Sequence, residues 1–308
     1  MITRFAPAPT GLLHLGHVVN AICVWGLARA MDGRVLLRIE DHDRQRSRPE
    51  YERALLDDLD WLGVAPDLYP TSAFRSGRCE SRQSDRLAIY ESNARGLIAR
   101  GLVYACGCSR RAIAQLADPS TDGERPYPGT CRDRGLPLDG DVAWRVRIDD
   151  GRESFDDLWC GPQTQEPAGQ CGDVVIRDRH GQWTYQFVAA VDDYLQGVDF
   201  VIRGRDLQGS TGRQIRLARL LGRERPARFA HHPLVMQSAT QKLSKSDGAT
   251  GIRDLRARGW TRDAVIAEAA RRVGLIAPAA TLSIDGVPAL FRDQPPRTTF
   301  SNPTPVHR

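Results

Sequence analysis

Residues 4–17 have the sequence RFAPAPTGLLHLGH, which predicts a strand, a turn and a helix in that order. Pro7 and Pro9 keep the residues before them out of the helical region, so the first half of this stretch is expected to be extended. Gly11 allows a turn, and the apolar, alanine-rich run 18–31 has the composition and length of a helix. These residues therefore predict the first unit of an α/β fold.

His14, Gly16 and His17 lie at the expected N-terminus of this helix. Free N–H groups and the positive end of the helix dipole favour a phosphate at such a position. Gly16 has no side chain, so a nucleotide can approach the backbone there. A His-x-x-His pair also suits a structural role or a metal site, and the pair alone does not separate these alternatives.

Two further segments place charged residues at the ends of predicted strands. Residues 34–41 (RVLLRIED) predict a buried strand that ends in acid, and residues 198–202 predict a strand directly before Arg203. Because ligands of open α/β sheets bind beyond the carboxyl ends of the strands, Glu40 and Arg203 are expected to face the same crevice as Arg4. Glu40 could meet a substrate ammonium there; a helix cap or an exposed acid is the alternative.

Strands that alternate with helices predict parallel α/β units. The expected fold class is α/β, with a Rossmann-like parallel sheet, an inserted subdomain and a short helical C-terminal region. Helices are predicted over residues 49–62, 87–100, 211–221, 252–258 and 262–273.

Lysine is almost absent from the chain. Of the 43 basic residues, all but Lys242 and Lys245 are arginines, and both lysines stand in QKLSKS at 241–246. Lysine is a compact point charge on a flexible stem, whereas arginine is a wide planar fork. A tight polyphosphate site can require the compact shape; a chance cluster is the alternative.

Three cysteines have the spacing of a metal site. Cys106 and Cys108 are one residue apart, and Cys131 follows a polar loop, which suits a tetrahedral zinc ion. No histidine lies between Cys108 and Cys131, so the phenolic oxygen of Tyr127 is the candidate fourth ligand. Buried thiols without a metal are the alternative. The remaining cysteines are expected to be structural: Cys23, Cys79, Cys160 and Cys171.

Together these motifs resemble class I aminoacyl-tRNA synthetases. HLGH at 14–17 is similar to the HIGH signature and KLSKS at 242–246 to the KMSKS loop, with a volume-conserving leucine for methionine. RIEDHD at 38–43 resembles the stretch found in glutamyl- and glutaminyl-tRNA synthetases. Cys-x-Cys followed by Tyr-x-x-x-Cys resembles the truncated branch of that family, the glutamyl-Q tRNA(Asp) synthetases.

The resemblance implies ATP-dependent activation of L-glutamate, with Mg²⁺ on the phosphates, and transfer of glutamate to the queuosine base in the anticodon of tRNA(Asp). It implies catalytic roles for His14, His17 and Lys245, and it adds to the ATP site Gly16, Lys242 and Ser244. It assigns L-glutamate to Arg4, Phe5, Ala6, Pro7, Ala8, Glu40, Tyr185 and Arg203. It assigns one structural zinc ion to Cys106, Cys108, Tyr127 and Cys131.

Two of these residues need comment. Ala8 stands where the family usually has serine, so any hydroxyl contact from that position is lost, although a backbone contact can remain. Tyr185 considered alone is a core aromatic rather than a ligand contact, and only the resemblance favours a role in the site.

The same resemblance predicts the division of the chain. Residues 1–100 and 185–235 are expected to form the two halves of the catalytic domain, and residues 101–184 an inserted acceptor-type subdomain with the zinc site. Residues 236–308 are expected to hold the KMSKS-like loop, a helical stem-contact region and a frayed tail. Few residues follow Ser246, so no anticodon-binding domain is expected.

Composition sets the remaining limits. The chain is 41% hydrophobic, which excludes general disorder, and it has no apolar run long enough for a membrane span. Without a signal peptide and with an odd number of cysteines, a cytoplasmic location with reduced thiols is expected. A monomer is also expected. Residues 203–308 carry 19 basic and 8 acidic side chains, which suggests that a polyanion docks there; a solvated charged face is the alternative.

Three other functions remain open from the sequence. A discriminating glutamyl-tRNA synthetase fragment would charge tRNA(Glu). The expected lack of an anticodon-binding domain disfavours this alternative. An unrelated nucleotidylyltransferase would lack RIEDHD and the zinc pattern. A non-catalytic tRNA-binding paralogue would have no reason to keep Lys242 and Lys245.

Overall fold

The computed structural model describes residues 1–116, 125–235 and 251–292. Its first unit consists of β1 (Ile2–Phe5), α1 (Leu15–Ala30) and β2 (Arg34–Leu37). The two strands are parallel neighbours, with Arg4 opposite Leu36. The predicted strand, turn and helix are confirmed, although the helix begins at Leu15, three residues earlier than expected. α1 is apolar and buried around most of its surface, as expected of a helix in the middle of a core.

A second unit consists of β8 (Phe200–Gly204), α8 (Thr211–Leu220) and β9 (Arg228–His232). Strands β8 and β9 are parallel, with Arg203 opposite His231. β5 (Glu153–Asp157) pairs with β9 in parallel and with β6 (Gly161–Gln165) antiparallel. The N–H of Asp199 donates to the carbonyl of Ile2, which joins the start of β8 to β1. The carboxyl ends of these parallel strands therefore meet at one edge.

The third sheet is antiparallel and consists of β3 (Val103–Cys106), β4 (Ala143–Val146) and β7 (Val174–Arg177). The expectation of a Rossmann-like parallel sheet is thus met only in part, because the described strands form mixed sheets. The parallel pairs β1–β2 and β8–β9 are each joined through a helix, whereas β5 and β6 are joined by a short hairpin, which forces antiparallel pairing.

The predicted helices are present within about two residues of their expected ends. The helices outside the two units above are α2 (Pro49–Leu62), α3 (Thr71–Arg75), α4 (Leu87–Ala99), α5 (Arg110–Leu116), α6 (Pro167–Cys171), α7 (Tyr185–Leu195), α9 (Ile252–Ala257), α10 (Arg262–Arg272) and α11 (Ala289–Arg292). α2 matches its predicted range, since Pro49 starts it and Gly63 ends it in the left-handed conformation with φ 75°.

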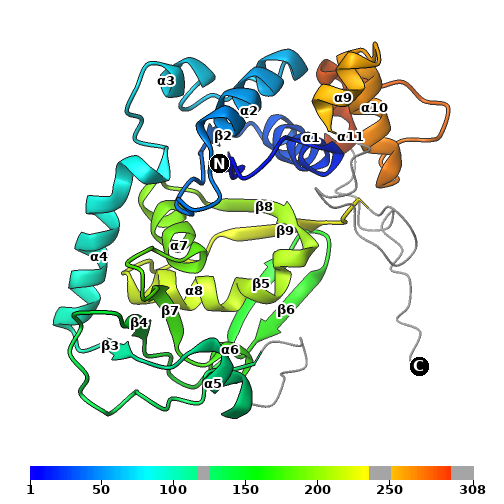
Figure 1. Ribbon diagram of the computed structural model, residues 1–308. Coiled ribbons are helices and arrows are strands. Elements are labelled where there is room, and N and C mark those ends of the chain that lie inside the picture. Colours follow the sequence, from blue (N-terminus) through cyan, green and yellow to red (C-terminus); the bar gives the residue numbers. More distant parts are fainter. Residues whose placement is uncertain (117–124, 236–250, 293–308) are drawn as a thin grey trace.

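The core has two main parts. The larger surrounds α1, against which α10 and α11 pack; Figure 1 shows these C-terminal helices beside α1. A Cβ atom at Gly26 would collide with the ring of Phe291, so close packing of α1 and α11 requires glycine there. The second part joins α4 and α7 to the antiparallel sheet. Among the described residues, no helix combines the length and apolarity that a bilayer crossing requires.

Candidate active site

A cleft of about 470 Å³ opens where β1, β2, β8 and β9 end. Its lining comes from residues far apart in the sequence, as expected at the carboxyl edge of an α/β sheet. The cleft brings together these predicted site residues: Arg4, Ala6, Ala8, His14, Gly16, His17, Glu40, Tyr185 and Arg203.

The two histidines of the first motif are fixed by the backbone at the start of α1. His14 is the N-cap, and its Nδ1 accepts the N–H of Gly16 at 3.1 Å. His17 Nδ1 accepts the N–H of His14 at 3.2 Å, and the two ring centroids are 4.1 Å apart. A ring nitrogen that accepts carries no proton, so each neutral ring carries its proton on Nε2. Both imidazoles can therefore donate from Nε2 beside a helix N-terminus, which suits phosphate oxygens.

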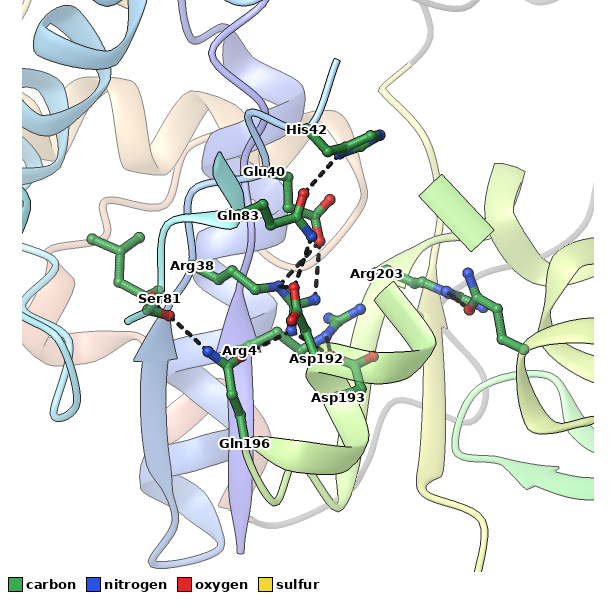
Figure 2. Close-up of polar contacts among 12 residues, drawn as sticks. Arg4, Arg38, Glu40, His42, Ser81, Gln83, Asp192, Asp193, Gln196 and Arg203 are labelled. Atoms are coloured by element: carbon green, nitrogen blue, oxygen red, sulfur yellow. Dashed lines mark hydrogen bonds and ion pairs between the residues drawn. The ribbon is translucent and has the colours of Figure 1, made fainter. Parts of the chain in front are cut away.

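Arg4 and Arg38 share one carboxylate, as Figure 2 shows. Asp193 Oδ1 lies 3.1 Å from Arg4 Nε and 2.8 Å from Arg38 Nη1. Arg38 Nη2 also donates to Glu40 Oε1 at 2.9 Å. Burial disfavours the charge on Arg38, but the neighbouring carboxylates outweigh it and raise the pKa of Arg38 above its ordinary value. Glu40 is thus fixed through Oε1, and its Oε2 makes none of the hydrogen bonds between described residues.

Asp192, next to this network, is fully buried and connects it to α4. Its carboxylate accepts from Arg86 Nε at 2.7 Å, from Tyr90 Oη at 2.8 Å and from Gln83 Nε2 at 2.9 Å. Gln83 Oε1 lies 2.7 Å from Nδ1 of His42, which lines the cleft (Figure 2). The wall of the cleft is therefore held by hydrogen bonds that reach into the core.

Arg203 has a different environment from Arg4. Its Nε donates to His231 Nε2 at 3.0 Å, and its Nη1 and Nη2 donate to the side chains of Gln214 and Thr211. Within the described part of the chain, no carboxylate oxygen lies within 4.0 Å of its guanidinium. Burial lowers the pKa of Arg203. A buried cation with only neutral partners is a site for an anionic ligand.

Tyr185 stands at the first position of α7 and is half-buried in the lining of the cleft. Burial and the charge of Glu40 raise the pKa of its phenol, which therefore keeps its proton at neutral pH. The phenol can donate a hydrogen bond into the cleft, in contrast to the purely structural role that the residue alone would predict.

Phe5 and Pro7 have buried side chains and are absent from the lining of the cleft. Their carbonyls accept the N–H groups of Arg38 at 2.9 Å and Glu40 at 3.1 Å. These two residues therefore hold the strand that carries the site, while Ala6 and Ala8 line the cleft.

Lys242, Ser244 and Lys245 lie outside the described residues. The described residues on either side of that segment are both at the cleft. Val235 belongs to its lining, and Gly251 forms an antiparallel bridge with His14.

The cysteine cluster is the second predicted site, and its side chains converge. The sulfur atoms of Cys106, Cys108 and Cys131 lie within 4.8 Å of one another, with 3.6 Å between those of Cys108 and Cys131. Tyr127 Oη lies 3.4 Å from Cys106 Sγ and 3.9 Å from Cys108 Sγ. Four ligands on a tetrahedral zinc ion stand about 3.5–3.8 Å apart, so this donor set fits the ion.

Electrostatics at the cluster also favour a metal ligand role. Burial disfavours the thiolate of Cys131, but the N–H of Gly107 and neighbouring donors lower its pKa to about 7. The N–H of Cys131 donates to Tyr127 Oη at 2.8 Å, but burial and the Cys106 thiol raise the pKa of that phenol above its ordinary value. The positive charge of a metal would be needed to stabilise the phenolate. All seven cysteines are among the described residues, and each is a free thiol.

Sequence reasoning missed the buried partners of the site. Asp193, Asp157 and His231 received no role, although they hold Arg4, Arg38 and Arg203. No local pattern marks Asp193, because it is 189 residues from Arg4 in the sequence. His42 belongs to the RIEDHD stretch, but nothing in that stretch alone indicates that it lines the cleft.

Residues 1–284 match the family described as tRNA synthetases class I (E and Q), catalytic domain. The glutamyl-Q tRNA(Asp) synthetase of Bordetella bronchiseptica is 47% identical over 82% of this chain and 76% of its own length. The chain belongs to the class I tRNA synthetases (E and Q). The glutamyl-Q tRNA(Asp) synthetases of Rhodobacter capsulatus and Ralstonia nicotianae are 41% and 42% identical, over 84% and 91% of this chain and 96% and 86% of theirs.

Solved structures give the same fold. The glutamate-tRNA synthetase of Elizabethkingia anophelis superposes with a TM-score of 0.74 and is 25% identical, over 93% of this chain. The chain covers only 64% of the length of that synthetase. A methionyl-tRNA synthetase from Mycobacterium tuberculosis, 15% identical over 85% of this chain and 62% of its own, shares the fold with a TM-score of 0.50.

Proposed function

We propose that this chain activates L-glutamate with ATP and transfers it to the queuosine base in the anticodon of tRNA(Asp). The observation that carries the proposal is the composition of the cleft. It is lined by Arg203, which has no carboxylate partner among the described residues, by Glu40, which Arg38 holds in place, and by two imidazoles at a helix N-terminus. The names of the relatives supply the acceptor, because nothing in the cleft itself identifies queuosine.

Glutamate has two carboxylates and one ammonium, and the cleft offers complementary charges. Arg203, with Arg4 beside Asp193, would bind carboxylates, and Tyr185 would donate a further hydrogen bond. Glu40 Oε2 would accept from the ammonium. Phe5, Ala6, Pro7 and Ala8 would act through the backbone, since two of their side chains are buried and two are methyl groups.

Activation joins the glutamate α-carboxylate to ATP. A carboxylate oxygen attacks the α-phosphorus in line, and the bond to pyrophosphate breaks, which leaves glutamyl-adenylate. His14 and His17 would donate to phosphate oxygens, with Gly16 open to the nucleotide. Lys245, with Lys242 and Ser244, would follow the departing pyrophosphate, and Mg²⁺ would arrive on the ATP phosphates. The contacts of Val235 and Gly251 with the cleft support this assignment, because those residues flank the lysine segment.

A second cleft of about 720 Å³ supports the transfer step. It shares His42, Asp43, Arg46 and Tyr185 with the first cleft and extends to Cys108 at the cysteine cluster. Its other charged lining residues are mostly basic, as the phosphates of an RNA loop would require: Arg110, Arg145, Asp178, Arg179 and His180. An acceptor hydroxyl that enters there would attack the carbonyl carbon of the adenylate, and AMP would leave.

Cys106, Cys108, Tyr127 and Cys131 would hold one structural zinc ion. The ion would fix the wall of the second cleft and would take no part in bond making. The proposed division of the chain follows: residues 1–100 and 185–235 for catalysis, 101–184 for the inserted subdomain, and 236–308 for the lysine segment and stem contacts. We propose that it acts as a monomer in the cytoplasm, where tRNA, ATP and reduced thiols coexist.

Mass spectrometry of tRNA after incubation with glutamate and ATP tests the function. Queuosine-containing tRNA(Asp) should gain one glutamyl group on its anticodon nucleoside, and tRNA(Asp) that lacks queuosine should gain none. A glutamyl group on the 3′ end of tRNA(Glu) would instead identify a glutamyl-tRNA synthetase fragment. No glutamyl transfer and no pyrophosphate exchange with glutamate would indicate a non-catalytic binding protein.

A further inference from the structure

We propose that Asp157 and His231 are positioning residues that set the orientation of Arg203 in the cleft, and through it the affinity for the amino-acid carboxylate. This inference rests on the proposed function only for the identity of the ligand. The geometry of the three side chains carries the inference.

The three residues form one chain of hydrogen bonds that runs from the core to the cleft. Asp157 ends β5, His231 lies in β9, and Arg203 lies opposite His231 in β8. His231 Nδ1 is 2.6 Å from Asp157 Oδ2, and His231 Nε2 is 3.0 Å from Arg203 Nε. The exposed fractions of Asp157, His231 and Arg203 are 3%, 0% and 4%, so water does not compete for these hydrogen bonds.

The partners determine the state of the imidazole. Asp157 Oδ1 accepts the N–H groups of Trp159 at 3.0 Å and Cys160 at 2.8 Å, and Oδ2 is left to accept from His231. His231 therefore carries its proton on Nδ1, and its Nε2 accepts from the N–H of Arg203. Only the neutral imidazole in this tautomer can receive that guanidinium.

Burial of His231 favours the neutral ring. Burial lowers the pKa of His231, and Arg203 lowers it further, while the hydrogen bond to Asp157 raises it. The other titratable groups that face it are Arg4 on β1 and Cys160, whose Sγ is 3.9 Å from the carbonyl of His231. A second cation beside Arg203 is thereby avoided.

The arrangement leaves the charge of Arg203 unneutralised but fixes the direction of its guanidinium. Arg4, by contrast, is bound to a carboxylate at 3.1 Å. A guanidinium fixed by a neutral acceptor keeps its full charge for an incoming carboxylate, and little rotamer freedom remains to be lost on binding. Asp157 and His231 thus orient the guanidinium of Arg203 without neutralising its charge.

Replacement of Asp157 by asparagine reverses the tautomer. The backbone N–H groups hold the amide oxygen at the Oδ1 position, so the amide NH₂ faces His231 Nδ1. Nδ1 then has to accept, and the proton moves to Nε2, opposite the N–H of Arg203. In Asp157→Asn we expect the KM for glutamate in ATP–pyrophosphate exchange to rise about tenfold to a hundredfold, with the KM for ATP unchanged. Asp156→Asn, on the exposed side of the same strand, is the matched control and should leave both unchanged.

Two substitutions of His231 separate positioning from packing. His231→Gln places an amide oxygen near the former Nε2 and keeps an acceptor for Arg203. His231→Asn keeps an N–H toward Asp157 but leaves Arg203 without its acceptor. Asn is shorter than Gln by one methylene group, so the packing loss of each variant is measured separately as the free energy of unfolding in urea. A packing role would make the KM for glutamate follow that loss, whereas positioning makes it follow the acceptor for Arg203. We expect the KM for glutamate to rise in His231→Asn and to be largely restored in His231→Gln.

Nitrogen-15 NMR of the histidine rings tests the inference independently of turnover. The wild-type chain should show His231 as the Nδ1–H tautomer, assigned by its loss in His231→Gln, and Asp157→Asn should shift it to Nε2–H. An Nε2–H or doubly protonated wild-type ring, or equal loss of glutamate affinity in His231→Gln and His231→Asn, would overturn the proposal. Wild-type protein that gives no exchange with glutamate would contradict the proposed function, while the tautomer would still decide this inference.

Discussion

In the cleft at the ends of the parallel strands, Asp193 holds Arg4 and Arg38, and each of these three charges has an opposite partner. At the cysteine cluster, three thiols and a phenol converge over a small core in which Tyr104, Cys106, Tyr127 and Cys131 are the buried members. The cleft is assembled by protein groups alone. The cluster instead gathers electron-pair donors that gain a common partner only when a cation binds.

The contrast shows how one chain can build two sites with different requirements. Burial, together with Cys131 and Cys106, raises the pKa of Cys108 to about 11, so thiolates close to one another are costly without a metal. In the cleft the opposite holds, because Arg4 and Arg38 lower the pKa of buried Asp193 against its desolvation. We therefore expect the two sites to respond separately to substitution.

Loss of the metal ligand should have the largest energetic effect. Cys131→Ala removes one of the four proposed zinc ligands, and structural zinc contributes apparent free energies on the order of 10 kcal/mol. We expect loss of about one zinc ion per chain, measured by elemental analysis, and loss of glutamyl transfer to tRNA, with glutamate-dependent exchange retained. Cys171→Ala, a thiol outside the cluster, is the control. Retention of zinc in Cys131→Ala would contradict the assignment of ligands.

Removal of Asp192 should destabilise the cleft side of the molecule. Asp192→Ala leaves Arg38 and Arg86 buried without this carboxylate, and such a loss costs about 3–5 kcal/mol. The free energy of unfolding in urea measures it. Exposed Asp150→Ala should change the same quantity by less than about 0.5 kcal/mol. Equal values for the two variants would mean that the buried network does not stabilise the cleft.

Lys245→Ala tests a proposed chemical role in the cleft while leaving the buried network around Asp192 intact. We expect exchange to fall about a hundredfold to a thousandfold, as when one charge-stabilising group of a transition state is removed. Urea unfolding and zinc content should remain as in the wild type, and exposed Arg95→Ala serves as the control for loss of a cation. Near-normal exchange would remove the role assigned to Lys245.

The smallest effect concerns pH. The pKa of His231 is lowered in the folded state, so below about pH 6.5 the unfolded chain binds more protons than the folded one at this position. Stability should therefore fall as the pH falls from about 6.5 toward 5. The fall should be shallower in His231→Gln, as measured by urea unfolding at each pH. An identical slope in both proteins would show that folding does not lower the pKa of His231.

The sequence could predict the residues at strand ends but not the groups that hold them. Glu40 and Arg203 follow apolar runs that end at the cleft, and the HLGH turn precedes an apolar helix, so local patterns located them. Cys106, Cys108 and Cys131 were predictable because ligand spacing is itself a local pattern. His231 and Asp193 were not, because their partners are distant in the chain and their roles depend on strand order.

In the sheets, too, local features were predictable from the sequence, whereas the pairing of distant strands was not. Strand and helix positions followed from prolines, glycines and apolar runs, as for α2, which matched its prediction. Mixed pairing did not follow, since the choice between parallel and antiparallel neighbours for β5 depends on which strands it meets, β9 and β6. The resemblance assigned Phe5 and Pro7 to glutamate, but alternation along the strand turns their side chains inward.

The proposed function requires a single cleft that accepts both glutamate and the phosphates of ATP. A crystal structure of the full chain with a non-hydrolysable sulfamoyl analogue of glutamyl-adenylate tests this most directly. We predict an analogue carboxylate on Arg203, its ammonium on Glu40 Oε2, and its sulfamoyl group within hydrogen-bond distance of Nε2 of His14 or His17. An analogue bound elsewhere, or bound there with Arg203 and both imidazoles out of contact, would contradict the account.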